Sequence, residues 1–177
     1  MDYLWTPWRY RYVTSSNRSA PNPLEPEPPA EPKCVFCHIP EATPDQERDR
    51  GLIFRGKHCF ICLNAFPYSS GHVMVVPYEH LNELQKLPSE AAFEMMALTQ
   101  RLEGVQRTLY KPDGINLGMN LGQAAGAGVA GHIHMHVLPR WLGDGNFLSV
   151  IGETRVLPEM LDITWQRMRE ALGVPVG

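Results

Sequence analysis

The chain has 177 residues and a mass of 20.0 kDa, which is enough for one folded domain with a substantial core but short for two. Hydrophobic residues make up 44% and charged residues 20%, a globular balance that excludes a wholly disordered, fibrous or collagen-like chain. The formal net charge of −3 provides no general attraction to nucleic acid or to anionic membranes, so we expect neither as a partner. No apolar run approaches the ~20 residues of a membrane span, and the N-terminus lacks a signal-peptide pattern, so a cytoplasmic protein is expected.

The N-terminal part divides by composition. Residues 1–13 are rich in aromatic side chains, which predicts a segment that packs on the domain or on a partner subunit. Residues 14–32 are interpreted as a linker, because six of the twelve residues at 21–32 are proline and cannot form ladders or helices. The folded domain is therefore expected at 33–177.

Runs of β-branched or alternating residues bounded by glycine and proline predict strands at 52–55, 58–63, 72–77, 115–121 and 132–138. The first two runs flank Gly56-Lys57 as a hairpin, which indicates an antiparallel sheet.

Two helices are expected. From Ser89, interpreted as the N-cap, apolar residues recur every three or four positions, which predicts an amphipathic helix over 89–109 that ends before Pro112. A closing helix is expected within 158–172. Strands and helices grouped in this way, without regular alternation, predict an α+β domain.

Three histidines stand at every second position, as His132, His134 and His136. On a strand their imidazoles share one face, and the apolar residues between them face the core: Ile133, Met135 and Val137. Three rings on one face are a poor packing solution, because they repel one another when charged and need separate partners when neutral. The pattern therefore indicates chemistry.

Two kinds of site fit these histidines: a tri-histidine metal cage, or imidazoles divided between nucleophilic and supporting roles. The preceding stretch, 122–131, is rich in glycine and alanine, so its backbone N–H groups can approach an anion closely. Asn120 and Gln123 at the loop entrance add neutral donors. This neighbourhood favours phosphoryl or nucleotidyl transfer by a histidine nucleophile.

The four cysteines form two Cys-x-x-Cys pairs. Cys34 and Cys37 open the domain, where a turn directs both thiolates to one point as the first half of a tetrahedral zinc site; the alternative is a reduced pair in a turn. Cys59 and Cys62 lie in a predicted strand and point to opposite faces, so they are expected in the core.

The pattern His-φ-His-φ-His-φ-φ at 132–138, followed by Pro139-Arg140-Trp141, resembles the signature of the histidine-triad (HIT) nucleotide-binding family. Leu4-Trp5-x-Pro7-Trp8-Arg9 and the loop at 120–128 resemble its bacterial branch of diadenosine tetraphosphate phosphorylases or adenylyltransferases. The resemblance implies a HIT-like fold, in which a mainly antiparallel sheet carries one long helix and a C-terminal helix. It implies nucleotidyl transfer on dinucleoside polyphosphates.

The resemblance also implies roles for individual residues. His134 corresponds to the nucleophile that forms a covalent nucleotidyl-histidine, and His136 to the histidine that contacts the α-phosphate. Asn64, eight residues before His72, matches the spacing of the ribose-binding residue and its supporting histidine. The implied catalytic residues are His134 and His136. The nucleotide-binding residues predicted from this spacing and from the glycine-rich loop are Asn64, His72, Asn120, Gln123, Ala127, Gly128, Val129 and His136.

In zinc-containing members of the family, two histidines complete the cysteine pair. The resemblance thus implies a structural Zn²⁺ ion on Cys34, Cys37, His80 and His132. No catalytic cofactor is expected, although the substrate can arrive as a magnesium complex because its polyphosphate chain is highly charged.

Gly128 departs from the family pattern, because hydrolases carry Gln at this position and one phosphorylase subgroup carries Ser. The sequence therefore leaves open whether phosphate or water accepts the nucleotidyl group. The alternatives are a hydrolase of other nucleoside phosphates or phosphoramidates, and a slow-turnover nucleotide-binding sensor or adaptor. Family members commonly form homodimers or higher homo-oligomers through the helix expected at 89–109 and its neighbouring strand, so a homo-oligomer is expected.

Overall fold

The computed structural model describes residues 34–145 and 158–176. The aromatic segment expected at 1–13 and the linker expected at 14–32 lie outside these residues and stay predictions. The described strands are β1 (Leu52–Arg55), β2 (Cys59–Leu63), β3 (Val73–Pro77), β4 (Gly114–Gly118) and β5 (Met135–Arg140). The α-helices are α2 (Val35–His38), α3 (Ser89–Tyr110) and α5 (Leu161–Ala171). Short 3-10 turns are η1 (Ile39–Glu41), η2 (Pro44–Gln46), η3 (Leu84–Lys86) and η4 (Gln123–Ala125).

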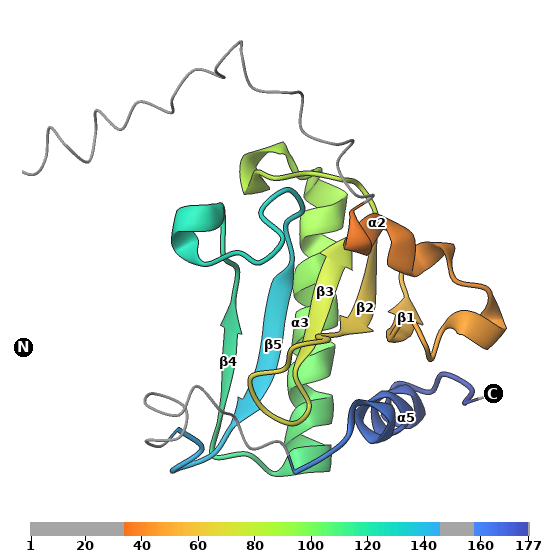
Figure 1. Cartoon of the computed structure of the whole chain (residues 1–177), viewed down its shortest axis with the longest axis vertical. Helices are drawn as coiled ribbons and strands as arrows, with labels where there is room; N and C mark the ends of the chain where they lie inside the picture. The colour runs from red at the N-terminus through yellow and green to blue at the C-terminus, as the bar shows by residue number, and fades with distance from the viewer. Residues whose placement is uncertain (1–33, 146–157, 177) are drawn as a thin grey trace, which may run out of the picture. The chain divides into compact units, whose positions relative to one another are not determined.

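The strands form one antiparallel sheet in the order β1-β2-β3-β5-β4 (Figure 1). β1, β2 and β3 follow one another as neighbours, and the hairpin expected around Gly56-Lys57 is confirmed. The chain then passes through α3 and the edge strand β4 before β5 enters between β3 and β4. The prediction of an α+β domain with an antiparallel sheet, one long helix and a C-terminal helix is confirmed.

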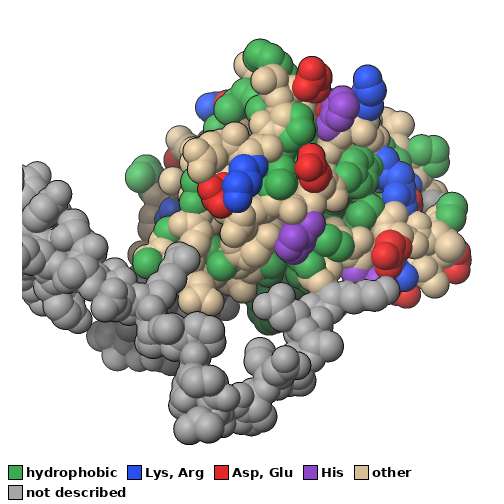
Figure 2. Space-filling view, turned by 90° about the horizontal axis from the view of Figure 1, so that it is seen from above, with side chains coloured by type: hydrophobic (Ala, Val, Ile, Leu, Met, Phe, Trp, Pro, Cys, Tyr) green, Lys and Arg blue, Asp and Glu red, His purple; other side chains and the backbone are tan. Residues whose placement is uncertain are grey.

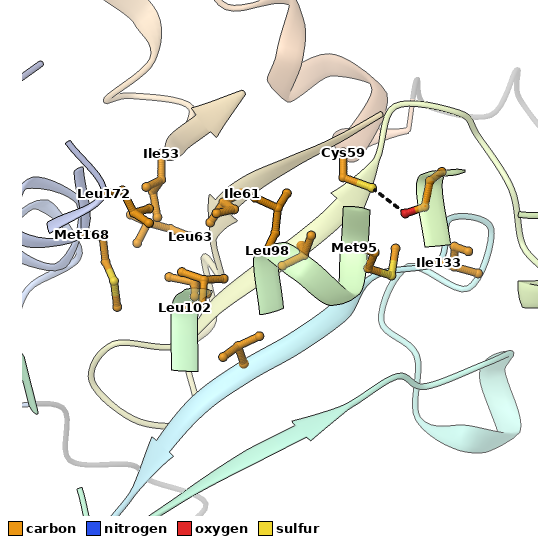
Figure 3. Close-up of a cluster of buried hydrophobic side chains, with 14 of the residues drawn as sticks. Ile53, Cys59, Ile61, Leu63, Met95, Leu98, Leu102, Ile133, Met168 and Leu172 are labelled. Carbon is orange, nitrogen blue, oxygen red and sulfur yellow. Dashed lines mark hydrogen bonds between the residues drawn. The ribbon is translucent and has the colours of Figure 1, made fainter. Parts of the chain in front are cut away.

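Both faces of the sheet are covered, which explains why every residue of β2 is buried. Odd-numbered strand residues such as Cys59, Ile61 and Val75 pack with α3 and α5 in one hydrophobic cluster (Figure 3). Even-numbered residues such as Phe60 and Cys62 pack with α2 and η1 in a second cluster on the other face. The sheet is therefore the middle of three layers.

The long helix α3 buries the expected stripe. Met95, Leu98 and Leu102 lie in the core, and Val105 and Leu109 pack against it. The start of the helix differs by one residue from the prediction, because Pro88 occupies the N-cap position and Ser89 is the first helical residue. Proline suits this position because the chain enters in an extended conformation. The helix ends at Tyr110, and its C-cap residue Lys111 adopts a left-handed conformation before Pro112.

The start of β5 differs from the prediction of a strand over 132–138. The antiparallel register pairs Val75 with Met135, so Pro77, two residues further along β3, lies opposite Ile133, and it has no N–H to donate. The ladder ends there, and the Nε2 atom of His132 donates to the Pro77 carbonyl at 2.9 Å instead. The predicted alternation still holds, because Ile133 and Val137 lie in the cluster under α3 and Met135 packs against it.

β2 and β3 each begin one residue later than predicted, and β4 and α5 differ from the predicted bounds by up to three residues. β4 ends at Gly118 because its last partner on β5 is His136, and the following residues leave the sheet for the glycine-rich loop. α5 begins at Leu161, after the extended residue Met160, and not within the first residues of 158–172. Within the described ranges, we find no helix with both the length and the apolar character needed to cross a membrane.

Candidate active site and metal centre

The three histidines lie at one end of the sheet. Figure 1 places the start of β5, the loop that contains η4, and α2 at this end. Histidine side chains reach the surface there among hydrophobic, acidic and basic side chains (Figure 2). His132, His134 and His136 themselves are buried, with exposed fractions of 0%, 4% and 8%.

The orientation of the His134 ring is set by a main-chain contact. Its Nδ1 atom lies 2.8 Å from the carbonyl oxygen of His132. A carbonyl oxygen only accepts hydrogen bonds, so Nδ1 carries the proton and Nε2 keeps its lone pair. Burial lowers the pKa of His134, although the bond to the carbonyl opposes this shift. The ring is therefore neutral at neutral pH, as a nitrogen nucleophile must be.

His136 is held by a chain of donors that begins in the loop between β2 and β3. The backbone N–H of Tyr68 donates to Nδ1 of His72 at 3.1 Å, so the proton of a neutral His72 ring is on Nε2. This Nε2 atom lies 2.9 Å from Nδ1 of His136 and donates to it. Burial, with a contribution from His134, lowers the pKa of His136 to about 4. The neutral His136 ring therefore carries its proton on Nε2, where it can donate.

Asn64 is fixed beside this chain. Its Nδ2 atom lies 3.3 Å from Nδ1 of His72, and its Oδ1 atom accepts the backbone N–H of Phe66 at 2.9 Å. The spacing of eight residues thus brings Asn64 and His72 together across the loop. Tyr68 also belongs to this group of side chains, because its ring packs against the His72 ring with 4.8 Å between the centroids.

A cavity of about 300 Å³ opens beside these residues. Its polar end is formed by Asn64, His134, His136 and the loop at Gly126, Gly128 and Val129. Its apolar wall consists of Val35, Phe36, Ile39, Leu63, Ala65, Phe66, Tyr68 and Met74. Such a cavity, with an apolar wall and a few convergent polar groups, suits a small ligand that has one apolar and one anionic part.

Four residues predicted to bind nucleotide lie outside this lining. His72 stands behind His136. Gln123 is exposed, and the amide of Asn120 reaches the Gly126 carbonyl at 3.5 Å. The backbone N–H of Ala127 points to the Gly122 carbonyl at 3.4 Å, so it is used within the loop.

The apolar wall was missed by the sequence analysis. Val35 and Phe36 lie between Cys34 and Cys37, which the sequence marks as metal ligands, and Ile39 follows on η1. Their spacing at 35, 36 and 39 is the one available signal, since it places three apolar side chains on one side of a turn of helix.

Cys34, Cys37, His80 and His132 meet with their ligand atoms within 4.8 Å of one another. Nδ1 of His132 lies 3.4 Å from Sγ of Cys34 and 3.7 Å from Sγ of Cys37, and Nδ1 of His80 lies 3.3 Å from Sγ of Cys37. A tetrahedral zinc site with ordinary bond lengths separates its ligand atoms by about 3.3–3.8 Å. The four residues fit zinc, and they could hold such an ion.

Cys59 and Cys62 have the surroundings that the sequence predicts. Cys59 and Cys62 are buried on opposite faces of the sheet, and burial raises the pKa of Cys59 to about 12. Both thiols are therefore inert core residues. His38 is exposed, and its Nδ1 atom lies 2.7 Å from the carboxylate of Glu41. His58 contributes its backbone N–H, and not its ring, to a contact with Glu94.

Comparison with known proteins gives consistent matches. The model of the HIT domain matches residues 45–141. A protein from Mycobacterium tuberculosis strain H37Rv named AP-4-A phosphorylase is 42% identical over 159 residues, which cover 89% of this chain and 77% of that protein.

Solved structures agree with this match. A zinc-bound histidine triad family protein from Mycobacterium smegmatis is 31% identical, with a TM-score of 0.62 over 80% of this chain and 94% of that chain. A histidine triad nucleotide-binding protein from Sulfolobus tokodaii shares the fold, with a TM-score of 0.61 at 23% identity over 79% of this chain and 92% of that chain. Together with the three histidines at and before the start of β5 and the cavity beside them, these matches show that the chain belongs to the HIT-domain family.

Proposed function

We propose that this protein is a nucleotidyltransferase that cleaves dinucleoside polyphosphates such as diadenosine tetraphosphate, with inorganic phosphate as the acceptor. The observation that carries the proposal is the His134 ring, which is neutral, buried and oriented so that Nε2 keeps its lone pair beside the cavity. The similarity to a protein named AP-4-A phosphorylase supports the substrate class and the acceptor.

The apolar wall accepts the base, and Asn64 accepts the ribose hydroxyls through the second lone pair of Oδ1. The α-phosphate then lies at the polar end of the cavity, against the backbone of Gly128 and Val129 and the Nε2–H of His136. Charge that develops on the phosphate oxygens is stabilised there by donors that are already oriented. Asn120, Gln123 and Ala127 act indirectly, by shaping the loop around Gly122 and Gly126.

In the first step, Nε2 of His134 attacks the α-phosphorus and an N–P bond forms. The bond from phosphorus to the bridging oxygen breaks, and the nucleoside triphosphate leaves. The imidazole becomes positively charged while Nδ1 retains its proton, and the His132 carbonyl stabilises this charge through the bond at 2.8 Å.

In the second step, an oxygen of inorganic phosphate attacks the same phosphorus. The N–P bond breaks, its electron pair returns to Nε2, and the product is a nucleoside diphosphate. With water as the acceptor, the attacking water releases a proton to solvent, and the product is a nucleoside monophosphate. The proposed steps use no cationic side chain and no catalytic cofactor, and the substrate's own phosphates can bind magnesium.

The residues Cys34, Cys37, His80 and His132 would hold a zinc ion with four protein ligands. A zinc ion with a full set of protein ligands supplies structural order to the residues around it. The residues that touch substrate in this proposal are all outside that set.

Product analysis tests the function directly. We expect purified protein to convert diadenosine tetraphosphate and phosphate to ATP and ADP, and to form little product without phosphate. Formation of ATP and AMP regardless of phosphate would identify a hydrolase. No product from this or other nucleoside phosphates, together with tight AMP binding, would identify a sensor or adaptor.

His134→Asn is the matched blank, because it removes the nucleophile and keeps a polar side chain of similar reach. We expect the turnover rate to fall by about 10⁴-fold or more, as for other removed nucleophiles, while the Kd for AMP stays within a few fold. A variant that retains most of the wild-type turnover would exclude the covalent intermediate on His134.

The protein is also proposed to be a homo-oligomer. Phe93 and Met96 on the outer side of α3 are 76% and 50% exposed, and Leu117 on the edge strand β4 is 49% exposed. Exposed large apolar side chains on a helix and on an edge strand are typical of subunit interfaces.

A further inference from the structure

One short segment carries both metal-ligand side chains and a wall of the cavity. The two residues between Cys34 and Cys37 are Val35 and Phe36, and both line the cavity. The centroid of the Phe36 ring lies 4.8 Å from that of His134 and 5.6 Å from that of His132. Whatever fixes the two thiols therefore also fixes this wall.

The segment has little stability of its own. α2 is four residues long, and its N-cap residue Cys34 makes no side-chain capping hydrogen bond. A single helical turn is unstable in isolation. The position of α2 thus depends on the burial of Phe36 and Ile39 on one side and on the contacts of the thiols on the other.

His132 links the same centre to the nucleophile. Its Nε2 atom donates to the Pro77 carbonyl, which leaves Nδ1 facing the two thiols. Its own carbonyl oxygen accepts the proton of His134 Nδ1. A rotation or shift at His132 would therefore change both the metal-ligand set and the direction of the His134 ring.

His80 joins the centre from the turn after β3, and it is not among the cavity-lining residues. The next residue, Leu81, accepts the backbone N–H of Ile133 at 2.7 Å. The centre thus ties together three chain segments: α2, the turn after β3, and the residues that lead into β5.

We propose that the Cys34–Cys37–His80–His132 centre is energetically coupled to nucleotide binding, with His132 as a positioning residue for His134. Zn²⁺ at these ligands favours the arrangement of Val35, Phe36 and His134 that binds nucleotide. Coupling of this kind is reciprocal, so nucleotide in the cavity must also favour retention of the metal. The proposal rests on the proposed function only in that a nucleotide occupies this cavity.

The experiment uses the full-length chain loaded with zinc. The Kd for Zn²⁺ is measured at equilibrium by competition with a chromogenic chelator, with and without AMP, and AMP affinity is measured by calorimetry before and after zinc removal. We expect AMP to tighten zinc binding roughly tenfold, and zinc removal to weaken AMP binding by the same factor, within the usual range of coupling between sites.

His80 offers a matched pair of variants, because it contributes a ligand without lining the cavity. His80→Ala should weaken both zinc retention and AMP binding. His80→Cys replaces one zinc ligand by another and should restore both. A merely structural need for the His80 side chain would not be met by cysteine.

The outcomes separate the two proposals. Equal zinc affinity with and without AMP, in protein that binds AMP, would overturn the coupling and leave the proposed function intact. Failure of the zinc-loaded protein to bind AMP would overturn both. Full AMP affinity in His80→Ala that has lost its zinc would also overturn the coupling.

Discussion

The proton of His134 is held by the main chain, since its partner is the His132 carbonyl and not an acidic side chain. The backbone at 132–134 therefore sets the orientation of the nucleophile. This stretch lies beyond the end of the β3–β5 ladder, because Pro77 of β3 has no N–H to donate. The loop residue Gly128 faces the same cavity, but its side chain is absent. The absent side chain at Gly128 therefore raises the question of which acceptor, water or phosphate, reaches the phosphorus next to His134.

Gly128→Gln tests how the acceptor is chosen. A Cβ atom at this position would meet nothing within 4 Å, so the substitution should be accepted without loss of stability. The added amide can hydrogen-bond a water molecule or the leaving oxygen, and we expect the ratio of AMP to ADP formed in the presence of phosphate to rise by about tenfold. Product chromatography gives this ratio. Gly128→Ala is the control, and an unchanged ratio in both variants would show that the acceptor is selected elsewhere.

At the scale of single elements, the β1–β2 hairpin is fastened to α3 by one carboxylate. Glu94 accepts the backbone N–H groups of Lys57 at 2.7 Å and Cys59 at 2.9 Å, and that of His58 between them. A Cβ atom at Gly56 would meet the backbone oxygen of Cys59 and Glu94 Oε1, each at 2.7 Å, so the turn requires glycine there. Burial alone would raise the pKa of Glu94, but the three backbone N–H bonds outweigh it and hold the pKa below its usual range.

Glu94→Gln should lower the free energy of unfolding by about 1–2 kcal/mol at pH 7, because the remaining amide oxygen is a weaker acceptor than a carboxylate. The folded-state pKa lies below the unfolded one, so this stabilisation is present above the ordinary glutamate pKa. It is lost as the pH falls through the folded-state value. Urea unfolding at pH 7 and below pH 4 should therefore show the difference from wild type shrinking in acid. Glu90→Gln on the same helix is the control, and an equal effect there would contradict the assignment.

The outer face of α3 gives a second prediction at this scale. Phe93→Glu places a charge on a side chain that is 76% exposed in the single chain, so the fold should be kept while an interface there would be lost. We expect light scattering after size exclusion to report a smaller oligomer than for wild type. An unchanged mass would place the interface elsewhere.

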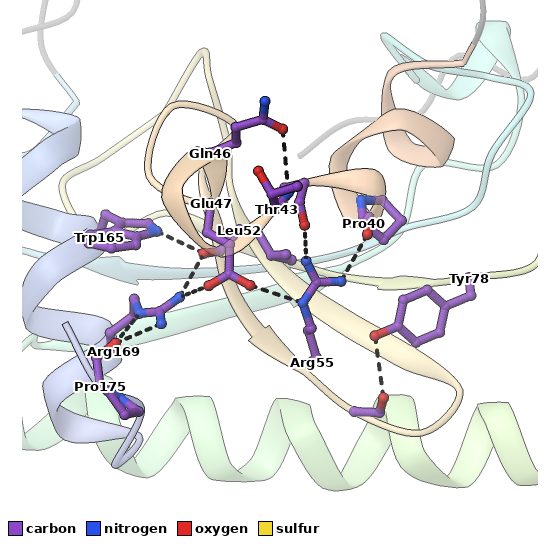
Figure 4. Close-up of polar contacts among 12 residues, drawn as sticks. Pro40, Thr43, Gln46, Glu47, Leu52, Arg55, Tyr78, Trp165, Arg169 and Pro175 are labelled. Atoms are coloured by element: carbon purple, nitrogen blue, oxygen red, sulfur yellow. Dashed lines mark hydrogen bonds and ion pairs between the residues drawn. The ribbon is translucent and has the colours of Figure 1, made fainter. Parts of the chain in front are cut away.

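At the scale of the whole molecule, the C-terminal helix is locked to the start of the sheet through Glu47 (Figure 4). Its carboxylate bonds Arg169 of α5 at 2.6 Å and Arg55 of β1 at 3.0 Å. Arg169 and the indole of Trp165 both also reach the Leu52 carbonyl. Glu47 and Arg169 are only 13% and 9% exposed at the side chain, so the pair is shielded from water.

Glu47→Ala should cost about 3 kcal/mol of unfolding free energy, because it leaves Arg169 buried without its carboxylate. Arg48→Ala is the control, since the Arg48–Asp162 pair joins the same parts of the chain but is more than half exposed on both sides. An exposed pair contributes about 0–1 kcal/mol. Denaturant unfolding measures both values, and similar losses would contradict the importance of burial.

Much of this architecture could be predicted from local pattern. The 3.6-residue period of α3, the hairpin glycine, and the opposite directions of Cys59 and Cys62 follow from neighbours in sequence. The start of β5 could not be predicted, because it depends on Pro77 lying opposite Ile133 in a register that only the folded sheet defines. The conformation of the loop at 122–131 could not be predicted either. Whether Ala127 or Gly128 faces the cavity depends on the left-handed conformations of Gly122 and Gly126.

The sheet that separates the two hydrophobic clusters also separates two kinds of constraint on the sequence. The layer with α2 and the histidines holds the metal-ligand set and the cavity, whereas no residue of α3 or α5 belongs to either. Substitutions in the latter, such as conservative exchanges at Leu98 or Met168, should change melting temperature and leave nucleotide affinity alone. The molecule is therefore a good subject for stabilisation by repacking on one side, with its chemistry protected on the other by the thickness of a β-sheet.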